Sequence, residues 1–344
     1  SVDLPDGTTL TKQDVIGYID DCVNNSGYKL VGDFRNLWAY TNKCTVKDYD
    51  YTKDATDKDG NALKWVEDDE NGNSNPDETE RMFSIKFNKH ANWNTGANGY
   101  NGIGYSNQYA LHFGVRGGQD YANTFPFGQG WGAGPVAPNL VADWKSIEPN
   151  DPRLDATVQD WTKSTTYTKG GGDGFVQETD YYGKKWAPIT AKKDDGSYVG
   201  NFEYVMFAGG WPSATDNNMQ LDNIHDLVLM RFAEVLLMQS ELKEDVGGIN
   251  EVRKRAGLSP IGAYSLQALQ NERRWELACE GIRWNDLRRW HIAAAALERQ
   301  TNQPVYYNGQ PSKNEAHNGG YAARYNATAG FQKMPDNQVA LGTV

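Results

Sequence analysis

The sequence predicts a mainly α fold in which a scaffold of helical hairpins carries long irregular loops and a few short strands. Two observations predict this class. Residues 226–290 contain three strongly helical segments that short connections join, as antiparallel helix pairs require. Residues 90–135 interleave eleven glycines with nine aromatic residues and keep neither the period of a strand nor that of a helix. We therefore expect a single domain over residues 1–344 that combines a regular scaffold with irregular loops.

The first part of the chain, residues 1–44, is predicted to be a helical start. Thr11 and Asp14 have the spacing of a capping box, and apolar side chains then recur every three or four residues. Gly27 ends this run, because glycine readily takes the conformation that closes a helix. A short turn and a second helix around residues 34–40 are expected to follow.

Residues 45–225 are expected to be the loop-rich, ligand-binding region. Within it, residues 82–87 alternate in polarity and are rich in β-prone side chains, which predicts a strand. The stretch of glycines and aromatic residues comes directly afterwards. Because glycine lets the backbone turn where other residues resist, this stretch is expected to present its rings from loops.

Residues 226–297 are expected to form the scaffold. Helices are predicted over residues 226–242, 247–258 and 266–290. Helix pairs joined by such short connections are typical of tetratricopeptide-like hairpins. The last part, residues 298–344, contains many Asn, Gly and Tyr residues and is expected to be a loop-rich tail.

Composition and charge limit the partners. The formal net charge of -11 argues against nucleic acid, and residues 47–80 hold twelve acidic and only four basic side chains. Aromatic residues make up 12% of a chain that is otherwise polar, with a mean hydropathy of -0.73. This balance suits carbohydrate, because sugar C–H faces stack on rings while hydroxyls need hydrogen-bond partners. No run of 18 apolar residues is present, so the sequence predicts no membrane span.

The three cysteines predict no zinc site, since none lies in a C-x-x-C pair or in a Cys/His cluster at ligand spacing. Cys22 and Cys44 have two alternatives, a disulfide in an oxidising compartment or free buried thiols, and free thiols are favoured. No histidine lies in a catalytic or metal-binding motif, and no phosphate-binding glycine loop follows a strand. The sequence therefore predicts no enzymatic activity.

The segment "NERRWELACEGIRWNDLRRW", residues 271–290, packs nine charged side chains and three tryptophans into twenty positions. One hypothesis is catalytic, because Glu276 and Glu280 lie one helical turn apart, near the spacing of a retaining glycosidase pair. A nucleic-acid groove is excluded, since five arginines face four acidic residues. The favoured interpretation is a structural network of i, i+3 pairs, namely Arg273 with Glu276, Glu280 with Arg283, and Arg283 with Asp286. Glu272 is assigned to the same network.

Candidate ligand-binding residues come from the glycine-rich loops. These residues lie near glycine, Asn or Gln, in a stretch without the period of a helix or a strand. The candidate stacking rings are Trp93, Tyr100, Tyr105 and Trp131, and the candidate hydrogen-bonding groups are Asn94, Asn98 and Gln108. Trp211, in "AGGWPS", is a similar candidate. The alternative is that these rings pack the interior of their own loops.

The acidic stretch suggests calcium as the one possible cofactor. Asp57, Asp59, Asn61 and Asp68 have the first three and the last ligand spacings of an EF-hand loop. Ala62 stands where that loop needs glycine, so a plain solvated loop is the alternative. The run from Asp68 to Asn75 offers a second, equally weak cage.

Three blocks of the chain resemble the SusD/RagB family of Bacteroidetes outer-membrane nutrient-binding lipoproteins. The charged segment matches the family pattern E-R-R-x-E-L-x-x-E-G-x-R-x-x-D-L-x-R at Glu272, Arg273, Arg274, Glu276, Leu277, Glu280, Gly281, Arg283, Asp286, Leu287 and Arg289. The helical blocks "LVLMRFAEVLLMQSEL" and "INEVRKRAGL", and the middle blocks "GW", "LVADW" and "DPR", resemble the family in the same order.

The resemblance implies a SusD-like fold and a non-enzymatic protein of carbohydrate uptake. It implies a lipid-anchored protein on the outer face of the outer membrane that captures oligosaccharide or polysaccharide and delivers it to a SusC-like TonB-dependent transporter. Family members begin with a signal peptide, a lipidated cysteine and a further helical portion, so this chain is expected to be a C-terminal portion whose membrane contact runs through an anchor outside it. The rival hypotheses are a glycoside hydrolase and a helical-repeat module for protein interaction.

Overall fold

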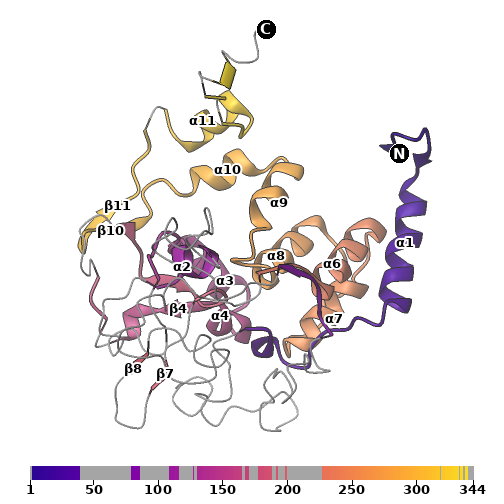
Figure 1. Ribbon diagram of the computed structural model, residues 1–344, viewed down its shortest axis with the longest axis horizontal. Coiled ribbons are helices and arrows are strands. Elements are labelled where there is room, and N and C mark those ends of the chain that lie inside the picture. The colour runs from indigo at the N-terminus through magenta and orange to yellow at the C-terminus, as the bar shows by residue number, and fades with distance from the viewer. Residues whose placement is uncertain are drawn as a thin grey trace, which may run out of the picture.

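The structure is a computed structural model of the chain, residues 1–344, and it is mainly helical (Figure 1). The residues that it describes are 2–38, 79–85, 108–115, 127, 130–164, 167–169, 177–187, 191–192, 198–199, 227–317, 319–332, 334–335 and 338–339. In this part of the chain no helix is long and apolar enough to cross a bilayer.

Three helices form the scaffold: α6 (Phe232–Lys243), α7 (Gly247–Arg255) and α8 (Leu266–Glu276). The α6–α7 turn is tight because Glu244 takes a left-handed conformation (φ 56°) and the Asp245 carboxylate accepts a hydrogen bond from the Gly247 amide. The three helices bury one apolar cluster, made of Phe232, Ala233, Leu236, Leu237, Ile249, Val252, Leu269 and Leu277. Since α6 buries residues on several faces, its sequence carries apolar side chains all round.

The predicted first helix is confirmed as α1 (Lys12–Asn25), with the Thr11–Asp14 capping box formed at its start. It follows a two-stranded hairpin of β1 (Val2–Asp3) and β2 (Thr9–Leu10) and packs along α6 (Figure 1). Gly27 takes a positive φ of 81° just after it. The expected second helix is a short 3-10 turn over Phe34–Leu37, and residues 39–40 lie outside the described part.

The predicted strand at 82–87 is confirmed as β3 (Arg81–Ile85), but its partner was not foreseen. β3 pairs antiparallel with β9 (Leu227–Arg231), where the sequence predicted the start of a helix at residue 226. The helical pattern really begins at Phe232, the first residue of α6. The preceding residues are apolar enough to suit either structure, and pairing with a strand about 150 positions earlier selects the extended one.

The predicted long helix over residues 266–290 is wrong, because two helices with a turn between them occupy this segment. α8 ends at Glu276, and α9 (Arg283–Arg289) begins after a turn in which Cys279 and Gly281 have positive φ of 64° and 81°. The turn frees backbone carbonyls that a continuous helix would use. Those of Glu276 and Cys279 accept hydrogen bonds from buried side-chain donors, so tertiary contacts compensate for the interrupted helix.

The middle of the chain supplies short elements beside the scaffold: α2 (Gln108–Phe113), α3 (Pro138–Ile147), α4 (Pro152–Thr157), β4 (Val158–Asp160), a 3-10 turn (Trp161–Lys163), β5 (Gln177–Glu178) and β6 (Tyr181–Gly183). β4 pairs antiparallel with β6, and a separate hairpin joins β7 (Ala191–Lys192) and β8 (Tyr198–Val199). An aromatic core cluster holds Phe34, Trp38, Phe127, Trp161, Tyr182 and Trp186. The Trp144 and Trp275 rings stack at 5.0 Å and join α3 to α8.

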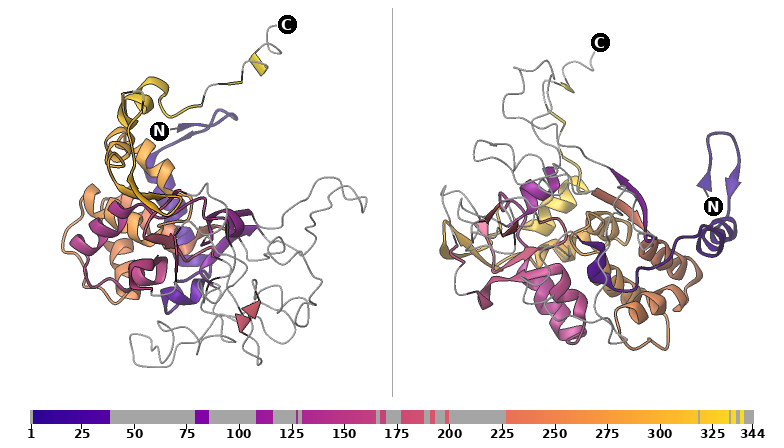
Figure 2. Two further views of the ribbon diagram at one scale, coloured as in Figure 1. Left: turned by 90° about the vertical axis from the view of Figure 1, so that its left-hand side faces the viewer. Right: turned by 60° about the horizontal axis from the view of Figure 1, so that its bottom comes forward.

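The tail contains more regular structure than the predicted loop-rich segment. α10 (Ala293–Glu298) ends the helical region, and β10 (Pro304–Tyr307) and β11 (Gln310–Lys313) form a hairpin whose inner strand pairs with β5. α11 (Tyr321–Thr328) then packs on the outer side of α10, at one end of the molecule (Figures 1 and 2).

Candidate functional site

A buried network of charges lies at the C-terminal end of α8, and Glu276 is its centre. The Glu276 carboxylate accepts hydrogen bonds from three guanidinium groups, those of Arg153 (2.8 Å), Arg231 (2.5 Å) and Arg255. Burial alone would raise the pKa of Glu276, but the three positive charges outweigh it and hold the pKa well below its usual value. Glu276 is therefore a charged structural group.

Glu280, one turn further on, is held in the same network. Its carboxylate accepts from the Arg231 Nε at 2.7 Å and from the Lys185 Nζ at 2.6 Å, and these cations keep its pKa below the usual value despite burial. The glycosidase hypothesis for Glu276 and Glu280 is contradicted by these contacts, because both carboxylates face buried cations.

None of the three predicted i, i+3 pairs is among the ion pairs of the described residues. Arg273 pairs with Asp286 at 2.8 Å and with Glu234 at 3.1 Å, across the turn and across to α6. Glu272 instead pairs with Arg153 at 2.6 Å. Among the described residues of this segment, an i, i+3 ion pair that was not predicted forms between Asp286 and Arg289, at 2.9 Å. Once the helix breaks at residues 277–282, the i, i+3 geometry across the break is lost and partners from other elements take over.

A partly exposed aromatic group lies on and beside α2, and close backbone contact positions it. Residues 130–133 run beside the end of α2, with the Gly130 amide donating to the Val115 carbonyl at 2.9 Å and the Ala133 amide to the His112 carbonyl at 2.7 Å. A Cβ on Gly130 would lie 2.4 Å from the backbone of Gly114, so only glycine permits this approach. The approach brings Trp131 against α2.

Three rings of α2 and the ring of Trp131 form two pairs there, and we call them the α2 aromatic surface: Tyr109, His112, Phe113 and Trp131. The Trp131 indole meets the His112 ring edge-on at 4.9 Å, and Tyr109 lies 5.2 Å from Phe113. Tyr109 is 37% and Phe113 is 42% exposed, whereas Trp131 is half-buried. Rings that a scaffold holds while part of each faces solvent are the kind of group on which a sugar ring stacks.

The sequence predicted only part of this surface. Trp131 was a predicted ligand residue, but Tyr109, His112 and Phe113 were not chosen. Their spacing of three and four residues in "QYALHF" places them on one side of a helix, which is the signal that could have found them.

The other predicted residues lie outside what the structure describes. These are the rings Trp93, Tyr100, Tyr105 and Trp211 and the amides Asn94 and Asn98, while Gln108 is described only as the first residue of α2. The calcium ligands Asp57, Asp59, Asn61 and Asp68 also lie there, and calcium stays a prediction. Within the described ranges no cluster of His, Cys, Asp and Glu side chains could hold a metal ion. Cys22 and Cys279 carry free thiols there, and Cys44 is not among the described residues.

Comparison with known proteins finds a matching family model and similar proteins whose names or folds agree with it. The SusD family model matches residues 65–340. SusD-like protein P38 of Formosa agariphila is 26% identical over 179 residues, which are 47% of this chain and 34% of that protein. The structure of a laminarin binding SusD-like protein superposes with a TM-score of 0.56 at 20% identity, over 84% of this chain and 52% of that one.

A further solved structure is surface glycan-binding protein A from Bacteroides thetaiotaomicron in complex with laminarihexaose. It superposes with a TM-score of 0.53 at 19% identity, over 88% of this chain and 54% of that one. The chain therefore spans about a third of the curated relative and about half of the solved ones. At these identities the solved structures share the fold, so the predicted SusD-like fold class is confirmed.

Proposed function

The chain belongs to the SusD family, and we propose on this basis that it is a cell-surface glycan-binding protein without enzymatic activity. It captures oligosaccharide and delivers it to a SusC-like TonB-dependent transporter in the outer membrane. The observation that carries the proposal is the family match over residues 65–340. The names of two solved relatives, which mention laminarin and laminarihexaose, support glycan as the ligand class.

The α2 aromatic surface is the proposed contact for the glycan, and the predicted rings at Trp93, Tyr100, Tyr105 and Trp211 are proposed to extend it. A sugar that stacks on an exposed ring removes apolar area from water while its hydroxyls keep their partners. A few such contacts give specificity for ring shape with modest affinity, which suits a protein that passes its ligand onward. Outside this surface, Glu276 and Glu280 are occupied by cations, which speaks against the rival glycosidase.

Calorimetric titration with laminarihexaose and a panel of other oligosaccharides tests the proposal. Trp131→Ala is expected to weaken binding of the preferred glycan by about 1 to 3 kcal/mol, or about 5- to 150-fold. Trp284→Ala is the matched control, because that indole is also partly exposed but lies on α9. If the parent and Trp131→Ala bind the preferred glycan with equal affinity, the glycan does not bind at the α2 aromatic surface.

Two further measurements separate the rivals. Release of reducing ends from the same glycans would support a hydrolase and contradict the proposal. Binding of no glycan at all would favour a module for protein interaction. Delivery is tested by isolating the chain from outer membranes under mild detergent, where a SusC-like transporter is expected to copurify.

A further inference from the structure

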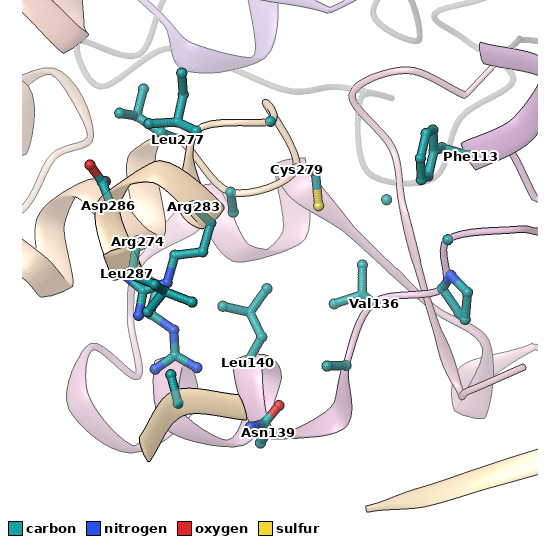
Figure 3. A pocket seen from close by; sticks show the side chains of 18 of the residues that line it. Phe113, Val136, Asn139, Leu140, Arg274, Leu277, Cys279, Arg283, Asp286 and Leu287 are labelled. Atoms are coloured by element: carbon teal, nitrogen blue, oxygen red, sulfur yellow. The ribbon is translucent and has the colours of Figure 1, made fainter. Parts of the chain in front are cut away.

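A cavity of about 470 Å³ lies between α3, α9, α10 and the turn that separates α8 from α9 (Figure 3). This volume falls in the range of small-molecule sites in proteins, which is roughly 300 to 1,000 Å³. Tyr109 and Phe113 of the α2 aromatic surface line part of it, so the cavity adjoins the proposed glycan contact, whereas neither Trp131 nor Glu276 lines it.

Most of the cavity wall is apolar. Val136 and Leu140 line one side and Leu277 and Leu287 another, and the Cys279 thiol points inward near Val136 (Figure 3). An interior of this kind gives hydroxyl groups few hydrogen-bond partners. It therefore suits an apolar body better than a sugar.

Positive charge is concentrated at one side, where the side chains of Arg274 and Arg283 lie next to each other (Figure 3). Arg274 already has a partner in Asp143 at 2.6 Å, and Arg299 shares that carboxylate at 2.7 Å. The other nearby carboxylate, that of Asp286, is held by Arg273 and by Arg289.

Arg283 is left without such a partner among the described residues. It forms no ion pair with them, and its Nη1 is buried with no hydrogen-bond partner there. Burial, together with the positive charge of Arg274, lowers the pKa of Arg283 to about 10. A buried donor without a partner carries a desolvation cost that an incoming anion removes.

We propose that this cavity binds a small organic carboxylate with an apolar body. The carboxylate accepts hydrogen bonds from the Arg283 guanidinium, and the body lies against Val136, Leu140 and Leu287. Guanidinium and carboxylate match in geometry and charge, so the anion supplies the direct partner that the Arg283 Nη1 lacks among the described residues, where the Asp286 charge acts on it only from a longer distance. The cavity shares Tyr109 and Phe113 with the proposed glycan contact, but it takes a ligand of different chemistry.

Three probes separate the parts of this chemistry in calorimetric titrations of the full chain. 3-Phenylpropanoate carries both the apolar body and the carboxylate, 3-phenylpropanol lacks the charge, and D-glucuronate lacks the apolar body. We expect 3-phenylpropanoate to bind at least about tenfold more tightly than either of the others, because only it satisfies Arg283 and the apolar wall together.

Variants then locate the binding. Arg283→Gln is expected to weaken 3-phenylpropanoate at least about tenfold, and Ala296→Phe, which fills the cavity, to abolish its binding. Arg288→Gln is the matched control, because that side chain lies on the same helix but packs on Trp284 and Phe331 outside the cavity. Trp131→Ala is expected to leave this affinity unchanged, because Trp131 is not among the residues that line the cavity.

Cys279 gives a readout that needs no variant. Its thiol lines the cavity, so 3-phenylpropanoate is expected to slow its alkylation by N-ethylmaleimide, measured by mass spectrometry of the labelled peptide, while labelling of Cys22 on α1 is unaffected. Unslowed labelling of Cys279 at millimolar probe overturns the proposal. Binding that survives both Arg283→Gln and Ala296→Phe overturns it as well.

Discussion

Glu276 shows how one residue can hold several parts of the chain together. Its three guanidinium partners come from α4, from the end of β9 and from α7, and all of these side chains are buried. Taking such charges out of water is costly, so the arrangement is stable only while each charge keeps its partners. Removing one member leaves the others buried and uncompensated.

The first prediction follows from this arrangement. Glu276→Gln is expected to lower the free energy of unfolding by about 3 to 5 kcal/mol, because three buried arginines lose a shared negative charge. Glu244→Gln, which removes an exposed ion pair with Lys12, is expected to cost far less, because water screens that pair. Both values come from denaturant titrations, and equal costs would contradict the structural role of the network.

Lys184 carries a prediction about pH. Its side chain is buried and donates to the Asp155 carbonyl at 2.5 Å, and burial lowers its pKa from 10.5 to about 8. Between these two values the unfolded chain holds a proton that the folded chain has released. The free energy of unfolding contributed by this group therefore rises as pH increases from about 8 to 10.5.

We expect Lys184→Met to remove that rise, by about 1 to 3 kcal/mol relative to the parent across this window. Lys254→Met is the control, because Lys254 is exposed on α7. The measurement is the free energy of unfolding from denaturant titrations at pH 8 and at pH 10.5. Parallel curves for the parent and Lys184→Met would show that Lys184 does not titrate in this range.

At the scale of elements, the α6–α7 hairpin depends on one glycine. A Cβ on Gly248 would lie 1.9 Å from the Leu236 carbonyl oxygen, so the two helices approach more closely than any other residue permits. The Ser240 hydroxyl accepts from the Ile249 amide at 3.0 Å in the same turn. The close approach of the two helices thus also gives the Ile249 amide, at the start of α7, a hydrogen-bond acceptor.

Gly248→Ala is accordingly expected to destabilise the fold by about 1 to 3 kcal/mol, because backbone atoms must shift to admit the methyl group. Gly262→Ala is the matched control, since a Cβ there meets nothing within 4 Å and the backbone is not left-handed. Its cost is expected to stay within about 0.5 kcal/mol. Thermal melts of the two variants test this prediction. A melting temperature of Gly248→Ala equal to that of the parent would mean that the hairpin tolerates a wider spacing between its helices.

At the scale of the whole molecule, the charge network and the two core clusters join elements from both halves of the chain around α8. α11 contributes little to this interior, because it packs on α10 and none of its residues is buried. Segments with little buried surface open at a lower free energy than the global unfolding reaction. Stability is therefore expected to be uneven, high around α8 and low at the end of the molecule that carries α11.

Hydrogen exchange measured by mass spectrometry tests this distribution. Peptides from α8 are expected to exchange only through global unfolding. Peptides from α11 are expected to exchange through local opening, whose free energy is on the order of half of the free energy of global unfolding. Glu276→Gln should lower the protection of α8 and leave that of α11 unchanged. Equal protection in the two helices would contradict the unequal distribution.

The candidate site was predictable only in part. Trp131 could be chosen because an indole beside three nearby glycines in a polar chain suits a sugar. The helical spacing of Tyr109, His112 and Phe113 was also open to prediction, but the contact of His112 with Trp131 was not, because it depends on hydrogen bonds from residues 130–133 to the end of α2. The cavity was missed for a related reason, since the apolar positions that line it come from elements far apart in the sequence.

By itself the sequence determined features that depend on residues a few positions apart. The capping box at Thr11, the strand at β3, the helical character of α6 and α7 and the family signature around Glu276 are all of this kind. Local hydrogen bonds and the periodicity of apolar side chains specify them, and both can be read from a short window.

The tertiary structure alone decided where α8 ends, where β9 gives way to α6 and which cations neutralise Glu276 and Glu280. Each of these depends on a partner far along the chain: β3 for β9, Arg153 for Glu276, Lys185 for Glu280. A buried charge or carbonyl is stable only beside its partner, and the positions of partners are set by the packing of the whole molecule.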